Sequence, residues 1–100
     1  MEFFDTTVTD EAKRNVMKCL NSEHLSEGVW VKEFEHAIET TFGYKNCVAV
    51  NSGTSALHLA LVLARVGEGD EVILPAQTFV ATGMAVLYCG AKPVFVAIGS

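Results

Sequence analysis

Small polar residues gather between an apolar run and a helical pattern in the stretch VAVNSGTSALHLAL, residues 48–61. Helix amino-termini leave backbone N–H groups without partners and carry partial positive charge, so they attract phosphate. Gly53 permits a tight turn and a close approach of a ligand to the backbone. The hydroxyl groups of Ser52, Thr54 and Ser55 add donors. The loop is therefore a candidate phosphate site, and the alternative is ordinary helix capping by Ser52 or Thr54.

The common nucleotide-binding signatures are absent from the sequence. There is no G-x-x-x-x-G-K-[ST] motif, which excludes a P-loop. The only G-x-G, at residues 67–69, leads into a strand pattern rather than a helix, so it is not a dinucleotide fingerprint. A phosphate at residues 51–55 must then be held without a lysine in the loop.

A second candidate group follows the next apolar run, in LPAQTFVAT at residues 74–82. Gln77, Thr78 and Phe79 fall at the carboxyl end of a predicted strand, the edge at which open parallel sheets bind ligands. Phe79 is either a core or capping aromatic, or a flat ring that stacks on a planar ligand. A phosphate cradle at one strand end and an aromatic ring at another suit pyridoxal phosphate.

The elements that must position these residues alternate along the second half of the chain. We expect strands at 46–50, 71–74 and 93–97, joined by helices that end at Gly67 and Gly90. Strand and helix in alternation imply right-handed crossovers and parallel pairing. The predicted fold class is α/β, a three-layer αβα arrangement with a mainly parallel sheet.

Two helices are predicted before this region. Thr9 is placed to cap the first, with acidic residues in its first turn. The second follows a loop that contains Gly28, and Gly43 is its stop signal. We interpret residues 1–45 as an amino-terminal helical segment and residues 46–100 as the start of a larger, incomplete domain.

The run NSGTSALHLALVLARVGEGDEVILPAQTFVATGMAVLYCGAKPVFV resembles the early core of the DegT/StrS family of nucleotide-sugar aminotransferases. These are pyridoxal-phosphate enzymes of the aspartate-aminotransferase fold, fold type I. The upstream stretch LSEGVWVKEFEHAIETTFGYKNCVAV is also similar to the family. The resemblance extends to about Val96. It implies the amino-terminal part of the large domain of such an enzyme, with pyridoxal 5'-phosphate as the cofactor.

The resemblance also implies roles for individual residues. Gly53, Thr54 and Ser55 resemble the family's phosphate-loop residues, and Phe79 matches the aromatic residue that stacks on the pyridine ring. Gly28 lies in the loop that, in such enzymes, lies near the active site of the partner subunit. The family resemblance thus implies a cofactor-binding set in this chain and a homodimer.

The catalytic groups of the family lie outside these residues. The Schiff-base lysine and the carboxylate that pairs with the pyridine nitrogen fall well beyond residue 100, and none of the five lysines here follows a family lysine motif. Ala97 stands where an acidic residue usually follows V-F-V. A truncated chain explains both facts. We expect no catalytic residue in this chain and no turnover from these 100 residues alone.

For the parent protein, the resemblance implies transfer of an amino group from an amino acid donor to a nucleotide-linked keto sugar, in amino-sugar biosynthesis. A pyridoxal-phosphate-dependent sugar 3-dehydratase of the same fold, in which the lysine is replaced, is one alternative. A catalytically inactive truncated or regulatory fragment is another. The lysine position that separates these alternatives is not among these residues.

Several other polar residues are interpreted as structural. His58 is expected to be satisfied by packing or by a nearby carbonyl, one helix turn after the candidate loop. Asp70 and Glu71 are expected to serve the turn before a strand. The carboxylates of the second helix are expected to form a solvated face: Glu33, Glu35 and Glu39.

Composition narrows the functional classes. The net charge is −5, from 7 basic and 12 acidic residues, and the basic residues do not cluster, which disfavours nucleic-acid binding. The apolar stretches fall short of the ~20 residues of a membrane span, and the first residues lack a signal peptide's cationic start. Three widely spaced cysteines without a C-x-x-C pair indicate reduced thiols in a cytoplasmic protein rather than a metal site. A hydrophobic content of 50% is rich for so short a chain and indicates part of a larger protein or of an oligomer.

Overall fold

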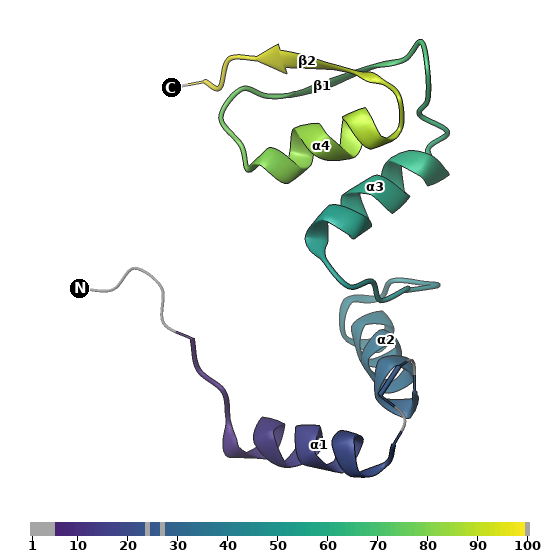
Figure 1. Ribbon diagram of the computed structural model, residues 1–100, viewed down its shortest axis with the longest axis vertical. Coiled ribbons are helices and arrows are strands. Elements are labelled where there is room, and N and C mark those ends of the chain that lie inside the picture. The colour runs from purple at the N-terminus through teal and green to yellow at the C-terminus, as the bar shows by residue number, and fades with distance from the viewer. Residues whose placement is uncertain (1–5, 24, 27, 100) are drawn as a thin grey trace, which may run out of the picture. The chain divides into compact units, whose positions relative to one another are not determined.

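The computed structural model describes residues 6–23, 25, 26 and 28–99 (Figure 1). The chain divides into two compact units, Met1–Ala49 and Val50–Ser100. The described part of the first unit contains two helices, and that of the second contains two helices and two strands. No helix in the described ranges is long and apolar enough to cross a membrane.

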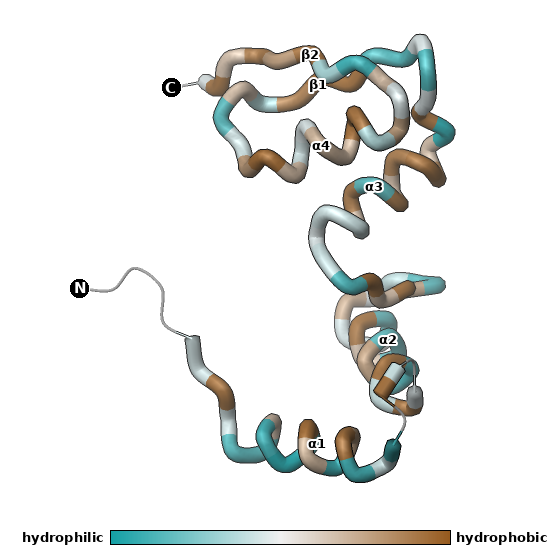
Figure 2. The backbone as a smooth tube through the Cα atoms, viewed as in Figure 1, coloured by the Kyte–Doolittle hydropathy of each residue, from teal (hydrophilic) through white to brown (hydrophobic). Residues whose placement is uncertain are grey.

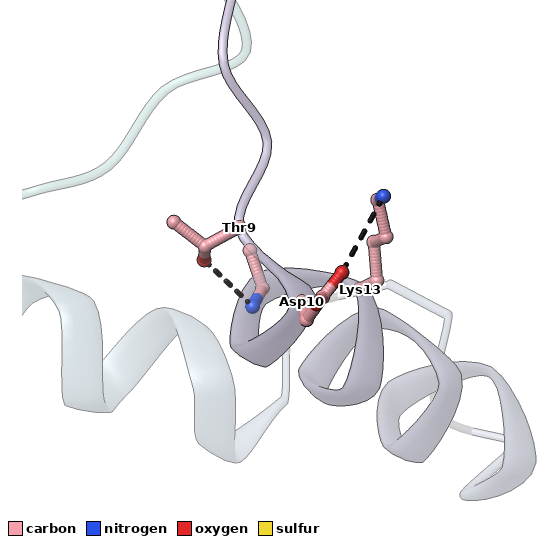
Figure 3. A network of polar contacts seen from close by, with 4 residues as sticks. Thr9, Asp10 and Lys13 are labelled. Atoms are coloured by element: carbon pink, nitrogen blue, oxygen red, sulfur yellow. Dashed lines mark hydrogen bonds and ion pairs between the residues drawn. The ribbon is translucent and has the colours of Figure 1, made fainter.

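Helix α1, Asp10–Asn21, begins where the sequence predicts because Thr9 caps it (Figure 3). The Thr9 hydroxyl oxygen accepts a hydrogen bond from the N–H of Ala12 at 3.1 Å. The Asp10 carboxylate adds negative charge in the first turn, where the helix dipole favours it, and lies 3.7 Å from the ammonium group of Lys13. Both side chains of this ion pair are exposed, so the pair adds little stability.

Helix α2, Val29–Phe42, ends at Gly43 as predicted. Gly43 has a φ of 72°, in the left-handed region that favours glycine, and its N–H donates to the carbonyl of Glu39 at 2.9 Å. At the other end of α2, Gly28 occupies the N-cap position with an extended backbone. Every residue of α1 and α2 keeps part of its surface accessible.

Residues 46–50, predicted as the first strand of the sheet, pair with no other strand in the described part of the chain, so this prediction is wrong. Their backbone bonds to side chains of α2 instead. The N–H of Cys47 donates to Oε1 of Glu39 at 2.8 Å, and the N–H of Ala49 donates to Oε1 of Glu35 at 2.9 Å. An apolar pattern predicts an extended chain, but a strand also needs a neighbouring strand, and carboxylates take that place here.

The second unit contains a parallel sheet of two strands, β1 (Glu71–Pro75) and β2 (Lys92–Val96), each within one residue of its predicted bounds. Helix α4 (Val80–Tyr88) is the crossover between them and lies against the sheet (Figure 1). Ile73 of β1 is in register with Val94 of β2. Two parallel strands joined by a helix form the βαβ unit of α/β proteins, so the predicted fold class is confirmed.

The core lies between this sheet and α4. Figure 2 shows hydrophobic residues along both strands and along α4. Small side chains let the helix approach closely: a Cβ added at Gly83 would stand 3.8 Å from Cδ1 of Leu74. In the described ranges, the buried apolar residues all belong to the second unit: Leu74, Ala81, Ala85, Val86 and Ala91.

Helix α3, Gly53–Leu63, ends earlier than the predicted stop at Gly67. Arg65 adopts a left-handed backbone with a φ of 61°. The N–H of Val66 then donates to the carbonyl of Leu61 at 3.0 Å, which is the hydrogen bond of a Schellman turn. A left-handed backbone at a helix end is most common at glycine, but here Arg65 adopts it. The predicted end of α3 at Gly67 is therefore too late.

Helix α4 begins at Val80, directly after Phe79. Phe79 keeps an extended backbone at the N-cap position and supplies no side-chain hydrogen bond to the helix. Gly90 ends the helix as predicted: it has a φ of 76°, and its N–H donates to the carbonyl of Leu87 at 2.9 Å.

Candidate functional site

The loop predicted to hold a phosphate forms the start of α3. Ser52 is the N-cap residue, and its hydroxyl oxygen accepts a hydrogen bond from the N–H of Ser55 at 3.1 Å. The Ser55 hydroxyl donates to Oδ1 of Asn51 at 2.7 Å. Of the two capping candidates in the sequence, Ser52 acts and Thr54 does not. The loop is thus shaped by its own side chains before any ligand is considered.

Two backbone N–H groups at this helix start remain available. Ser55 bonds to the Ser52 side chain, and the N–H of Ala56 donates to the Ser52 carbonyl at 3.1 Å. Among the described residues, the N–H groups of Gly53 and Thr54 have no acceptor. Open space surrounds the position that a Cβ at Gly53 would take. Unpaired N–H donors at the positive end of a helix, with room beside them, fit an anionic group such as phosphate.

Phe79 stands at the start of α4 with 78% of its surface exposed, so it is not a core residue. Its ring lines a pocket of about 230 Å³ together with residues of β1, α4 and β2. Next to it, the hydroxyl oxygens of Thr78 and Thr82 lie 3.0 Å apart. An exposed ring beside an apolar pocket is available to stack on a planar ligand.

Helices α3 and α4 pack on each other and begin at the same end of the second unit (Figure 1). The loop at residues 51–55 and Phe79 therefore lie toward one end of this unit. The carboxyl end of β1, at Pro75, leads to the start of α4 at that same end. Ligands of open parallel sheets bind at the carboxyl ends of the strands, so the location suits a binding site.

Gly28 belongs to the first unit, away from this set in the chain. It precedes α2 and lines a pocket of about 400 Å³ whose other walls include Leu25 and Trp30. Its expected proximity to a partner subunit stays a prediction.

Two residues interpreted as structural have structural contacts. The half-buried ring of His58 lies against that of Tyr88, with 5.6 Å between the ring centroids. The Asp70 carboxylate accepts a hydrogen bond from the N–H of Gly67 at 2.8 Å, which closes the turn before β1. Both residues thus make structural contacts of the kind that the sequence predicts.

The carboxylates of α2 do not all form a solvated face, and this expectation is corrected. Glu33 is exposed, but Glu35 and Glu39 are half-buried and accept the backbone hydrogen bonds described above. The signal in the sequence was their spacing of one helical turn, followed by an extended segment. Partial burial, together with the charges of Glu39 and Glu35, raises the pKa of the Cys47 thiol.

Residues 6–100 match the DegT/DnrJ/EryC1/StrS aminotransferase family, which is nearly the whole chain. The protein belongs to this family, as the motifs predicted. It is 46% identical over 82 residues to the GDP-perosamine synthase of Caulobacter vibrioides, an alignment that covers 81% of this chain and 22% of that protein.

Two solved structures show the same fold. Spr1654 from Streptococcus pneumoniae, assigned as a sugar aminotransferase and solved in PLP, PMP and apo forms, superposes with a TM-score of 0.89 at 34% identity, over 96% of this chain and 24% of that one. The Escherichia coli GDP-4-keto-6-deoxy-D-mannose-3-dehydratase with bound hydrated PLP superposes with a TM-score of 0.85 at 30% identity. That alignment covers 95% of this chain and 26% of the dehydratase chain. This chain thus spans about a quarter of the length of these proteins, and its fold is that of the amino-terminal part of fold type I enzymes.

Proposed function

We propose that this chain is the amino-terminal part of a pyridoxal-phosphate-dependent aminotransferase that acts on a nucleotide-linked keto sugar, with an amino acid as donor, in amino-sugar biosynthesis. Membership of the aminotransferase family supports the reaction class. The name of the Caulobacter relative supports the substrate class. The observation that carries the proposal is the start of α3, where the N–H groups of Gly53 and Thr54 have no acceptor.

In this proposal the cofactor is pyridoxal 5'-phosphate, and four residues of this chain hold it. The N–H groups of Gly53 and Thr54 donate to its phosphate, and the ring of Phe79 lies on its pyridine ring. The Ser55 hydroxyl, which donates to Oδ1 of Asn51 in this structure, turns to donate to the phosphate instead. The bound cofactor withdraws electrons from the carbon that bears the amino group and so carries that group between two substrates. No basic side chain lies in the loop, so neutral donors and the helix dipole hold the phosphate charge.

A sugar 3-dehydratase is the second candidate, favoured by the structural similarity to the E. coli dehydratase. Both reactions use the same cofactor, so the loop and Phe79 fit either one. The products distinguish them. Incubating the full-length protein with a nucleotide-linked keto sugar, pyridoxal phosphate and glutamate gives an aminated sugar in one case and a sugar without its 3-oxygen in the other.

We also propose that the protein is a homodimer in the cytoplasm. In each subunit, residues 1–45 form an amino-terminal helical segment, and residues 46–100 form the start of the large domain, which further sequence completes. Large apolar side chains of the first unit remain exposed, for example Leu25 at 70% and Val29 at 65%, and such faces are normally covered in an assembled protein. The spacing of the cysteines is typical of reduced thiols, which the cytoplasm maintains.

The cofactor site is tested by titrating the full-length protein with pyridoxal phosphate and following its absorbance. In the Ser55→Glu variant, a carboxylate lies beside the phosphate, and we expect affinity to fall by at least about tenfold because two like charges in close contact repel. The exposed residue Thr41 of α2 supplies a matched control, since Thr41→Glu adds the same charge elsewhere. Equal titration curves for wild type and Ser55→Glu would contradict the site.

The inactive-fragment alternative has its own test. Because no lysine here follows the family motif, we expect these 100 residues, mixed with pyridoxal phosphate and reduced with borohydride, to be labelled weakly and at several lysines. Peptide mapping measures the distribution. A single stoichiometric adduct on Lys45 or Lys92 would show that this chain carries its own reactive lysine.

A further inference from the structure

The extended segment 47–49 is held by side chains of α2 on the side where a neighbouring strand would pair with it in a sheet. Successive N–H groups of an extended chain point to opposite sides, so residues 47 and 49 present theirs to the same side and residue 48 to the other. Both N–H groups on that one side are bonded, to Glu39 at 2.8 Å and to Glu35 at 2.9 Å.

The two carboxylates have the spacing that this arrangement needs. Residues 35 and 39 lie about 6 Å apart along the axis of a helix. Residues 47 and 49 lie about 6.6 Å apart along an extended chain. Glu39 bonds to the earlier residue and Glu35 to the later one, so the segment runs antiparallel to α2. Carboxylates on adjacent helical turns thus replace one edge of a β-ladder.

These hydrogen bonds are strong ones for their environment. An ionised acceptor shortens and strengthens an N–H···O bond relative to a neutral one. Both glutamates and both bonded residues are half-buried, which limits competition from water. Along the chain, a single residue, Val50, separates the second bonded residue from Asn51, where the candidate loop begins. A fixed backbone at residue 49 therefore limits where the loop can start.

We propose that Glu35 and Glu39 are positioning residues, which fix residues 47–49 in an extended conformation and thereby set the backbone that enters the loop at 51–55. The effect on the loop is a property of the chain alone. Only the consequence for cofactor affinity rests on the proposed function.

The experiment is hydrogen–deuterium exchange at residue resolution on the full-length protein without cofactor. Glu35→Ala and Glu39→Ala remove the acceptors, and we expect the amides of Cys47 and Ala49 to exchange about tenfold faster or more, which corresponds to the loss of a hydrogen bond to a charged group. The Gln variants keep an acceptor oxygen without the charge, so these amides should exchange at rates between those of wild type and of the Ala variants. Glu33→Ala, an exposed glutamate of the same helix, is the matched control.

The loop has its own reporter, the amide of Ser55, which bonds to the Ser52 side chain. If the glutamates position the loop, Ser55 exchanges faster in the Ala variants than in the control, and pyridoxal phosphate affinity falls in parallel. Should an Ala variant unfold, Glu39→Asp repeats the test, because it keeps the charge and shortens the side chain by one methylene group.

Each other outcome is decisive. If the amides of residues 47 and 49 exchange at the wild-type rate in the Ala variants, the glutamates do not hold this segment. Faster exchange there with an unchanged Ser55 amide overturns the positioning role and leaves a purely structural one. If wild-type protein binds no pyridoxal phosphate, the proposed function fails, while the Ser55 amide still decides whether the glutamates position the loop.

Discussion

Two stretches of this chain pass from an apolar run into a helix, and their backbones are held in different ways. In the first, side chains of α2 bond to residues 47 and 49, and the Ser52 side chain caps α3. In the second, β1 is held by the backbone of β2, and α4 begins at Val80 without a side-chain hydrogen bond from its N-cap residue, Phe79. Similar apolar patterns are therefore stabilised in two different ways. Hydrogen bonds from side chains hold the first stretch, whereas strand pairing and burial in the core hold the second.

The contrast extends to the side chains. Leu74 of β1 is 3% exposed, whereas Val48 in the first stretch is 68% exposed. The first stretch leads to the loop that we assign to the cofactor phosphate, and the second forms the packed core. Binding loops usually belong to the less stable parts of a protein, because they must open to ligand, so polar support is a reasonable solution for the first stretch.

The largest effect should come from truncating Leu74, and the same substitution at Val48 provides the comparison. We expect Leu74→Ala to lower the free energy of unfolding by about 2–5 kcal/mol, since it leaves a cavity beside α4. Val48→Ala should change it by about 0.5 kcal/mol or less, because this side chain is mostly exposed. Urea denaturation of the full-length protein measures both. Equal losses would mean that Val48 is covered as completely as Leu74 in the assembled protein.

The two helix starts should differ by a smaller amount. Ser52→Ala removes the acceptor for the Ser55 N–H, and we expect a loss of about 1 kcal/mol of stability. Phe79→Ala removes an exposed ring that caps nothing, so stability should change less, although affinity for pyridoxal phosphate should fall if the ring stacks on it. Urea denaturation and cofactor titration of the same variants separate the two roles. A larger stability loss for Phe79→Ala would reverse the comparison.

Much of the fold followed from local signals in the sequence. Thr9, Gly43 and Gly90 marked the ends of three helices correctly, because caps and left-handed glycines act within a few residues of the chain. The strands predicted at 71–74 and 93–97 were found within one residue of those bounds, since β-branched apolar runs between turn signals are typical of buried strands. The family motif pointed to the loop that forms the start of α3.

The failures involve contacts between residues that the local pattern does not connect. Residues 46–50 read as a sheet strand, but their hydrogen-bond partners lie up to 14 residues earlier, in side chains of α2. For the same reason Glu35 and Glu39 were interpreted as solvated. The end of α3 was misplaced because Arg65 adopts a positive φ, which propensity assigns to glycine.

The smallest effect concerns Cys47, whose backbone N–H donates to the carboxylate of Glu39. Its pKa is raised by partial burial and by the charges of Glu39 and Glu35, so the neutral thiol is favoured in the folded protein. A group with a raised folded pKa contributes stability that is present below its unfolded pKa and is lost as the pH rises through the folded pKa. Native Cys47 should therefore react with iodoacetamide more slowly at mildly alkaline pH than the same residue in urea, since only the thiolate attacks.

Glu39→Gln sharpens this test of the first stretch, because it keeps an acceptor for the Cys47 N–H and removes one of the charges that raise the thiol's pKa. We expect native Cys47 to be alkylated faster in this variant, with its pH profile displaced toward lower pH. Glu33→Gln, on the exposed side of α2, should leave the rate as in wild type. The contrary outcome is an alkylation rate that is the same in wild type and Glu39→Gln but still lower in native protein than in urea. Burial alone would then raise the pKa of the Cys47 thiol. The carboxylates would act on this segment only through their hydrogen bonds.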